Sequence, residues 1–196
     1  MSAPLRGLRR LLDRLRGAGG PGAAPSAGAP GAHVQDPDAP VGPSTRLRRT
    51  TGAEETTSPL SIERVERMLT GPMGYGVQRH EDEGHACLLG TWDGFPFVIE
   101  EPEDHPGWLL VSGDAQDPVS PGERDEVAAS VNDWNRDKYY PTVCLVEVPV
   151  GTVVRATYLV DLSHGATSEQ LRLHLDTALS ACTQALSRVG PLLPEL

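Results

Sequence analysis

The order of elements at the end of the chain can be read from one stretch, residues 160–190, with the sequence VDLSHGATSEQLRLHLDTALSACTQALSRVG. Its first residues end a run of strand type, and Thr167 or Ser168 then provides a helix cap with Gln170 as its partner. The apolar residues that follow recur at helical spacing for five turns, which predicts an amphipathic helix that covers a sheet. They are Leu171, Leu175, Ala178, Leu179, Cys182, Ala185, Leu186 and Val189.

The residues before this stretch predict the sheet and two further helices. Ser58-Pro59 and Ser120-Pro121 each combine an N-cap hydroxyl with a proline suited to the first helical position, and the helices should end near Thr70 and Asp137. Asp93-Gly94 indicates a two-residue hairpin turn. Strands are expected at Tyr75–His80, Gly84–Trp92, Phe95–Glu101, Gly107–Gly113, Thr142–Val148 and Val153–Leu162. The predicted fold is α+β, an antiparallel meander with packed helices in the order α-β-β-β-β-α-β-β-α.

Composition divides the chain into two parts. Residues 1–57 are predicted to be a disordered extension, first basic and then rich in Pro, Gly and Ala, whereas residues 58–196 form the folded domain. Residues 1–50 hold eight arginines and three acids, a net charge of +5. Because the whole chain has a net charge of −10, residues 51–196 have a net charge of −15. An acidic domain disfavours nucleic-acid binding and favours basic or amphipathic partners.

The extension begins with a basic amphipathic segment at residues 4–16. Leu5, Leu8, Leu12 and Leu15 follow helical spacing, and arginines occupy other positions. This pattern fits a docking peptide, a peripheral contact with anionic lipid, or a solvated arm. Arginines and an aspartate interrupt the leucines, so a secretory signal peptide is not expected. Three widely spaced cysteines, Cys87, Cys144 and Cys182, are typical of buried thiols in a reducing compartment, and the expected location is cytoplasmic.

Few residues offer catalytic or metal chemistry. Asp161 and His164 could form a carboxylate–imidazole dyad, and His80 and His85 could face each other across a hairpin beside the acids at 81–83. Simpler interpretations are a turn that leads into a helix and a solvated hairpin tip. We therefore predict no enzyme, no metal and no cofactor, and we keep as the alternative a hydrolase or metal-dependent enzyme that uses His164 and Asp161.

Three phrases at the junctions of these elements resemble the YbjN family. They are Gly90-Thr91-Trp92-Asp93-Gly94, Trp134-Asn135-Arg136-Asp137 and the run from Val160 to Leu171. The resemblance covers residues 59–189 and implies a fold like that of type III secretion chaperones, a regulatory role in bacterial sensory transduction and no enzymatic activity. It also implies peptide binding and a homodimer.

A chaperone-like sheet can bind an extended peptide along a strand edge or an amphipathic helix in an apolar groove. The large aromatic side chains of the domain are the candidates for such a groove. They are Trp92, Phe95, Phe97, Trp108, Tyr139, Tyr140 and Tyr158. The expected function is that of a regulatory or chaperone-like module that binds a protein or peptide segment.

Overall fold

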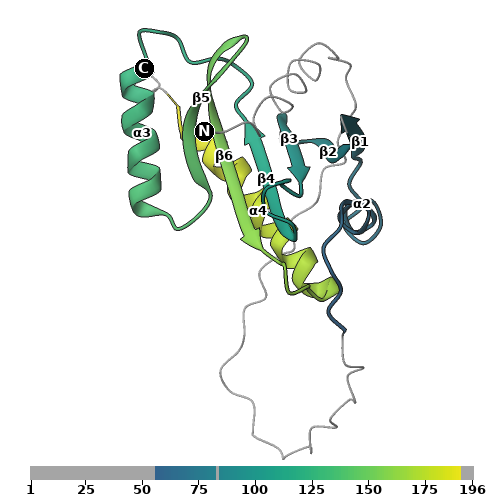
Figure 1. The fold of residues 1–196 in the computed structure, drawn as a ribbon. Helices are drawn as coiled ribbons and strands as arrows, with labels where there is room; N and C mark the ends of the chain where they lie inside the picture. The colour runs from purple at the N-terminus through teal and green to yellow at the C-terminus, as the bar shows by residue number, and fades with distance from the viewer. Residues whose placement is uncertain (1–55, 83, 191–196) are drawn as a thin grey trace, which may run out of the picture.

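The computed structural model describes residues 56–82 and 84–190, which form one sheet and three helices (Figure 1). The predicted extension at residues 1–57 and the segment at residues 4–16 therefore lie, apart from Thr56 and Thr57, outside the described residues. The elements are α2 (Ile62–Thr70), β1 (Gln78–Asp82), β2 (His85–Trp92), β3 (Phe95–Glu100), β4 (Trp108–Asp114), α3 (Arg124–Asp137), β5 (Thr142–Val148), β6 (Gly151–Asp161) and α4 (Ser168–Arg188). This order confirms the predicted α+β fold.

The six strands form a single antiparallel sheet in the order β1-β2-β3-β4-β6-β5. The first four strands are the predicted meander. The chain then leaves the sheet through α3 and returns as β5 at the far edge, and β6 fills the place between β5 and β4 (Figure 1). The sequence did not predict this inversion, because it depends on pairing between strands far apart in the chain.

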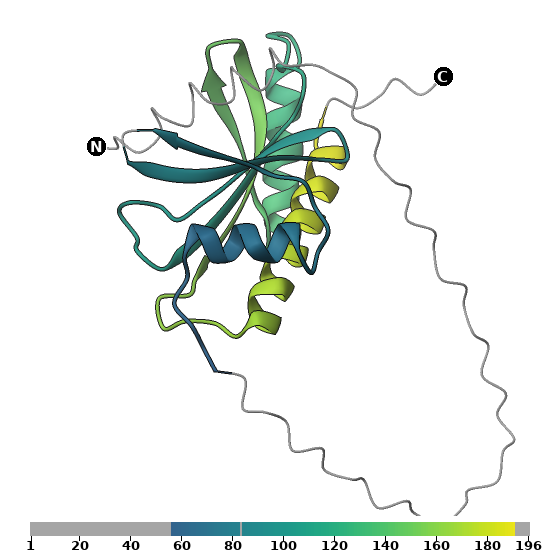
Figure 2. The same cartoon turned by 90° about the vertical axis from the view of Figure 1, so that its right-hand side faces the viewer.

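The helices pack against one face of the sheet, as the view from the side shows (Figure 2). Their buried stripes join the sheet's inward side chains in a single core cluster. The predicted stripe of the last helix is buried from Leu171 to Leu186 in α4, and α2 and α3 also bury apolar residues against the sheet. We call the opposite face, which α2, α3 and α4 do not cover, the open face; its residues Leu89, Val98 and Val153 are nevertheless buried.

The local signals around α4 and around the hairpin between β2 and β3 are confirmed. Thr167 and Gln170 form a reciprocal capping box: the Thr167 hydroxyl accepts the Gln170 N–H at 3.1 Å, and the Gln170 side chain accepts the Thr167 N–H at 2.9 Å. Asp93 and Gly94 have φ values of 49° and 85°, as a primed two-residue turn requires.

The predicted start of the first helix is wrong. Ser58 is not its cap, because the Ser58 backbone pairs with Ala166 through two hydrogen bonds of 3.1 and 3.0 Å and is therefore extended. The cap is Ser61, whose hydroxyl accepts the N–H of Arg64 at 3.3 Å. The middle helix also begins later than predicted, at Arg124. Ser120 forms a turn instead, in which its carbonyl accepts the Glu123 N–H at 3.0 Å.

The starts of the first and last strands differ most from the prediction, and the other strand bounds agree to within two residues. Residues 75–77 do not join the sheet, since the Tyr75 N–H donates to the carbonyl of Leu69 at the end of α2, at 2.8 Å. The last strand begins at Gly151 rather than Val153, because Gly151 already pairs with Val148. The connection that was expected to span residues 149–152 is therefore a two-residue turn.

Candidate interaction surface

The strand register assigns side chains to the open face in rows. In one row Leu159, Leu110, Glu100, Cys87 and His80 are successive partners on β6, β4, β3, β2 and β1. Because paired residues of a sheet lie on the same face, these five side chains share one face of the sheet, on which Cys87 is buried. The next row toward the end of the sheet contains Asp161 paired with Trp108, and Asp82 paired with His85.

The β6 half of these rows presents apolar side chains to solvent. Leu159 is 50% exposed, whereas Leu110 and Trp108 are half-buried. Carboxylates flank them, since Glu100 is the partner of Leu110 and Asp161 is the partner of Trp108. We call Leu110, Leu159, Trp108, Glu100 and Asp161 the open-face patch. An apolar strip bordered by acids suits an amphipathic partner with basic residues.

An acidic hollow of about 280 Å³ lies at the same end of the sheet. Residues at the start of α2, at the start of β2 and in the loop between β3 and β4 line it, among them Glu63, His85, Glu101 and Glu103. His85 Nε2 lies 3.0 Å from Glu100 Oε2, which connects the hollow to the open-face patch. The Glu101 carboxylate accepts the Gly107 N–H at 2.6 Å and so fixes the loop before β4.

A buried ion pair lies further along the open face. Asp114 and Arg155 are partners on β4 and β6, and their side chains are only 2% and 7% exposed. The carboxylate accepts two hydrogen bonds from the guanidinium, of 2.6 and 2.9 Å. Within the described strands Arg155 is the one arginine on this face, and Asp114 neutralises it. The exposed charge of the open face is therefore acidic.

The predicted aromatic residues fall into separate groups. Trp92 contacts Phe97 and Tyr75 edge-to-face, with ring centroids 5.3 and 5.6 Å apart. Phe97 is fully buried, and Trp92 and Phe95 pack against the core on the helix-covered side. Phe97 presents no surface to a partner, so we leave it out of the proposed surface.

The tyrosines form a second group beside α4. Tyr140 and Tyr158 lie edge-to-face with centroids 5.8 Å apart, and the Tyr158 hydroxyl lies 2.9 Å from His174 Nδ1. Burial raises the pKa of Tyr158. Tyr139 is fully exposed and Tyr140 is 54% exposed. Trp108 belongs to neither group, and its ring centroid lies 5.0 Å from that of His105. The structure therefore brings together only parts of the predicted aromatic set.

Of the two residues considered for a catalytic dyad, His164 is exposed and Asp161 is held by its own turn. The Asp161 carboxylate accepts the Ser163 N–H at 2.9 Å, and the hydrogen bonds from Ser163 lower the pKa of Asp161. The prediction that His80 faces His85 is wrong, because the register pairs His80 with Cys87. Among residues 56–82 and 84–190, no three His, Cys, Asp or Glu side chains are grouped so that they could hold a metal ion.

The sheet edge at β5 is occupied by the Trp-Asn-Arg-Asp phrase of α3. The Asn135 amide donates to the Val143 carbonyl at 2.7 Å and accepts the Val143 N–H at 2.9 Å. Trp134 Nε1 donates to the Pro141 carbonyl at 3.1 Å. These bonds satisfy backbone groups that an edge strand would otherwise offer to another chain.

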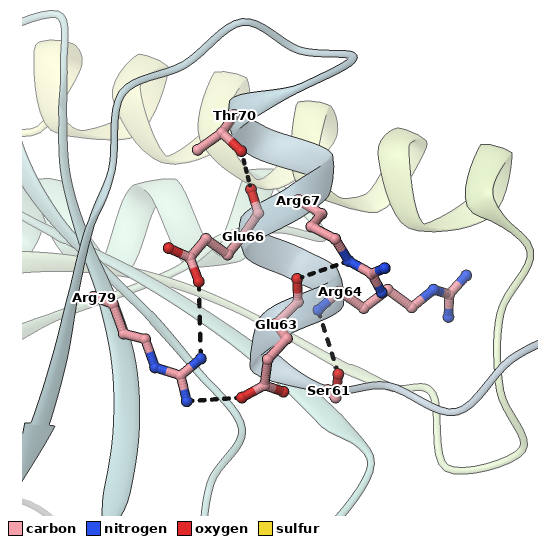
Figure 3. Close-up of polar contacts among 7 residues, drawn as sticks. All are labelled: Ser61, Glu63, Arg64, Glu66, Arg67, Thr70 and Arg79. Carbon is pink, nitrogen blue, oxygen red and sulfur yellow. Dashed lines mark hydrogen bonds and ion pairs between the residues drawn. The ribbon is translucent and has the colours of Figure 1, made fainter.

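The other edge, β1, is tied to α2 by charge (Figure 3). Arg79 lies 2.7 Å from a Glu63 oxygen and 3.8 Å from a Glu66 oxygen. The hydrogen bond from Arg79 lowers the pKa of Glu63. β1 is short and charged, so it is a poor template for strand addition. Neither edge is therefore as suited to a partner as the open face.

Sequence reasoning did not select Leu110 and Leu159 as site residues. Their signal was present in the alternation of the strands, because both positions have the opposite parity to the core residues Leu109, Val111 and Ala156. Both alternating sets on β4 contain apolar residues, so the pattern alone did not separate the core face from the open face. The pairing with acids became visible only with the register.

Comparisons with known proteins agree with this architecture. The family model for YbjN, described as "Putative bacterial sensory transduction regulator", matches residues 61–191. The crystal structure of YbjN from E. coli, described as "a putative transcription regulator", aligns with a TM-score of 0.54 at 13% identity. The alignment covers 67% of this chain and 92% of that one. No curated protein matches the chain. No helix in the described ranges is long and apolar enough to cross a membrane.

Proposed function

The chain belongs to the YbjN family, and from this premise we propose that it is a non-enzymatic regulatory module that binds a segment of another protein. The open-face patch carries the proposal. It combines exposed Leu159 with half-buried Leu110 and Trp108, and its charged neighbours are Glu100 and Asp161. Such a surface gains free energy when an apolar stripe covers it, and its carboxylates favour arginine or lysine beside that stripe.

The shape of the surface favours a helix over an added strand. Asn135 occupies the β5 edge, and β1 is short and charged. A partner that added a strand would have to compete with these features. An amphipathic helix laid across the sheet needs no free backbone groups and uses side-chain contacts alone. We therefore propose a basic, amphipathic helical segment as the partner.

The proposal also includes the bounds of the domain, its compartment and its contacts. The domain is taken as residues 58–196 and the compartment as the cytoplasm, in keeping with the free thiols of Cys87, Cys144 and Cys182. A homodimer and a membrane contact through residues 4–16 stay predictions. The exposed tyrosines Tyr139 and Tyr140 stay candidate contacts at a second place. Nothing in the geometry of the described residues favours the alternative hydrolase.

Photo-cross-linking in cells tests the proposal directly. A benzophenone amino acid at position 159 should capture a protein that the same probe at position 173 does not capture. Leu173 is a matched control, because it is 60% exposed and lies on α4 rather than on the open face. Capture should fall when Leu110→Asp is added. Equal capture from positions 159 and 173 would argue against the proposed surface.

A further inference from the structure

We propose that the amphipathic segment at residues 4–16 of this same chain binds the open-face patch, so that the chain blocks its own partner site. This inference rests on the proposed function, because it names an internal competitor for the same surface. The segment contains the two chemical features that the patch requires. It has leucines at positions 5, 8, 12 and 15 and five arginines between residues 6 and 16.

Charge is the first argument for this pairing. Residues 4–16 contain five arginines and one aspartate, so the segment carries a net charge of +4. The open face presents Glu100 and Asp161 within the patch, and its one arginine is neutralised by Asp114. The acidic hollow beside the patch adds Glu101 and Glu103. Opposite charges around an apolar contact orient the segment and increase its local concentration at the surface.

Size is the second argument. A helix over residues 4–16 would be roughly 20 Å long, at about 1.5 Å per residue. The row Leu159, Leu110, Glu100, Cys87 and His80 crosses five strands and therefore four inter-strand intervals. At about 4.8 Å per interval this row is roughly 19 Å long. The segment is therefore about as long as the row from β6 to β1, in which Leu159 and Leu110 are the apolar members that reach solvent and Cys87 is buried.

The path of the chain is the third argument. Ser58 pairs with Ala166, which follows the end of β6, and the Leu162 N–H donates to the Gly107 carbonyl beside Trp108 at 3.0 Å. The folded domain therefore begins at the end of the sheet that contains Trp108 and Asp161. Residues 17–55 provide 39 connecting residues. A Gly-rich chain of that length has a typical end-to-end distance of about 35 Å, which is enough to bring the segment back over the patch.

Cross-linking within the purified full-length protein tests this inference. We expect a benzophenone at position 159 to form adducts that peptide mapping locates within residues 1–17, whereas the probe at position 173 does not. Leu8→Asp should lower the yield about tenfold, because burial of one leucine is worth about that factor. Gly7→Asp adds the same charge off the leucine stripe and should lower it by no more than about threefold.

Two further arms identify the occupant. In a mixture of isotopically light and heavy chains, self-binding should give adducts whose two peptides carry the same label, and a statistical share of mixed light–heavy adducts would overturn self-binding. A synthetic peptide of residues 1–17 should cross-link at position 159 when it is added to the Leu8→Asp chain. If it does so while the intact chain gives no internal adduct, the inference fails and the proposed surface stands. If neither adduct forms, both fail.

Discussion

Asp114 and Arg155 lie directly opposite each other on β4 and β6 and form a two-point ion pair that is almost completely buried. Burial acts to lower the pKa of the Arg155 guanidinium, but the hydrogen bonds and charge of Asp114 together outweigh it, and the pKa is raised. The guanidinium therefore stays charged. The pair places a satisfied polar link in the face of the sheet that the helices leave uncovered.

Removal of one partner of this pair should destabilise the domain strongly. Asp114→Asn leaves the Arg155 charge buried without its counter-charge, and we expect the free energy of unfolding to fall by about 3–5 kcal/mol. Urea denaturation followed by circular dichroism measures the loss. As a control, Asp133→Asn breaks a surface pair with Arg136, whose side chains are 64% and 67% exposed. That change should cost less than about 1 kcal/mol, and equal losses would contradict the assignment.

The Asn135 amide should protect the β5 edge. Asn135→Ala removes both hydrogen bonds to Val143. The backbone N–H and carbonyl of Val143 then have no side-chain partner. We expect a loss of about 1–3 kcal/mol in unfolding free energy and increased self-association through the uncovered edge. Denaturation and size-exclusion chromatography measure the two effects. Asn132→Ala is the matched control, because Asn132 is an exposed asparagine on the same helix. Identical behaviour of the two variants would contradict this role.

Sequence reasoning predicted the features that depend on neighbouring residues. The stripe of α4 follows from apolar spacing, and the Asp93-Gly94 turn follows from the positive φ values that it needs. The family resemblance added the sheet with helices packed against it, and the family match over residues 61–191 confirms that resemblance.

Features that depend on distant partners were not predicted. The cap of the first helix moved from Ser58 to Ser61 because Ala166, more than 100 residues away, pairs with the Ser58 backbone. Asp114 and Arg155 are 41 residues apart and share no motif. The open-face patch also depends on register, since Leu110 and Leu159 become neighbours only when β6 is inserted beside β4. No short-range sequence pattern predicts that β6 lies between β4 and β5.

The three thiols should differ in reactivity in the native protein. Burial raises the pKa of Cys87 to about 11 and that of Cys182 to about 12. At pH 8 the thiolate fraction of Cys87 is then about one in a thousand, against roughly a quarter for a free cysteine. Half-buried Cys144 should therefore react first with iodoacetamide, although burial raises its pKa too. Timed alkylation and peptide mapping measure the order, and equal native rates would contradict it.

The same shifts make stability depend on pH. A thiol whose pKa is higher in the folded state favours the protonated form there. Its contribution to the free energy of folding is therefore complete when the pH is below its pKa in the unfolded chain, about 8.5. The contribution is lost as the pH rises toward the folded values of about 11 and 12. The melting temperature should fall over this range, and Cys182→Ala should flatten the fall. A melting temperature with the same pH dependence in both proteins would show that Cys182 does not contribute.

Gly113 sets the distance between the sheet and α4. A Cβ at this position would lie 2.7 Å from Cζ of Phe97 and 3.0 Å from Cδ1 of Leu186. Phe97 and Leu186 are both buried core side chains, so the new methyl group of Gly113→Ala should displace one of them or the strand. We expect the free energy of unfolding to fall by about 1–3 kcal/mol. Gly122→Ala is the control, because no atom lies within 4 Å of its added Cβ.

A double variant separates crowding from backbone effects at Gly113. Phe97→Leu alone removes part of a fully buried ring and should cost stability. Combined with Gly113→Ala, the smaller side chain makes room for the new methyl group, so the two losses should add up to more than the loss of the double variant. Urea denaturation of all four proteins gives this coupling. Strict additivity would mean that Gly113 is required for its backbone and not for the close approach of Phe97.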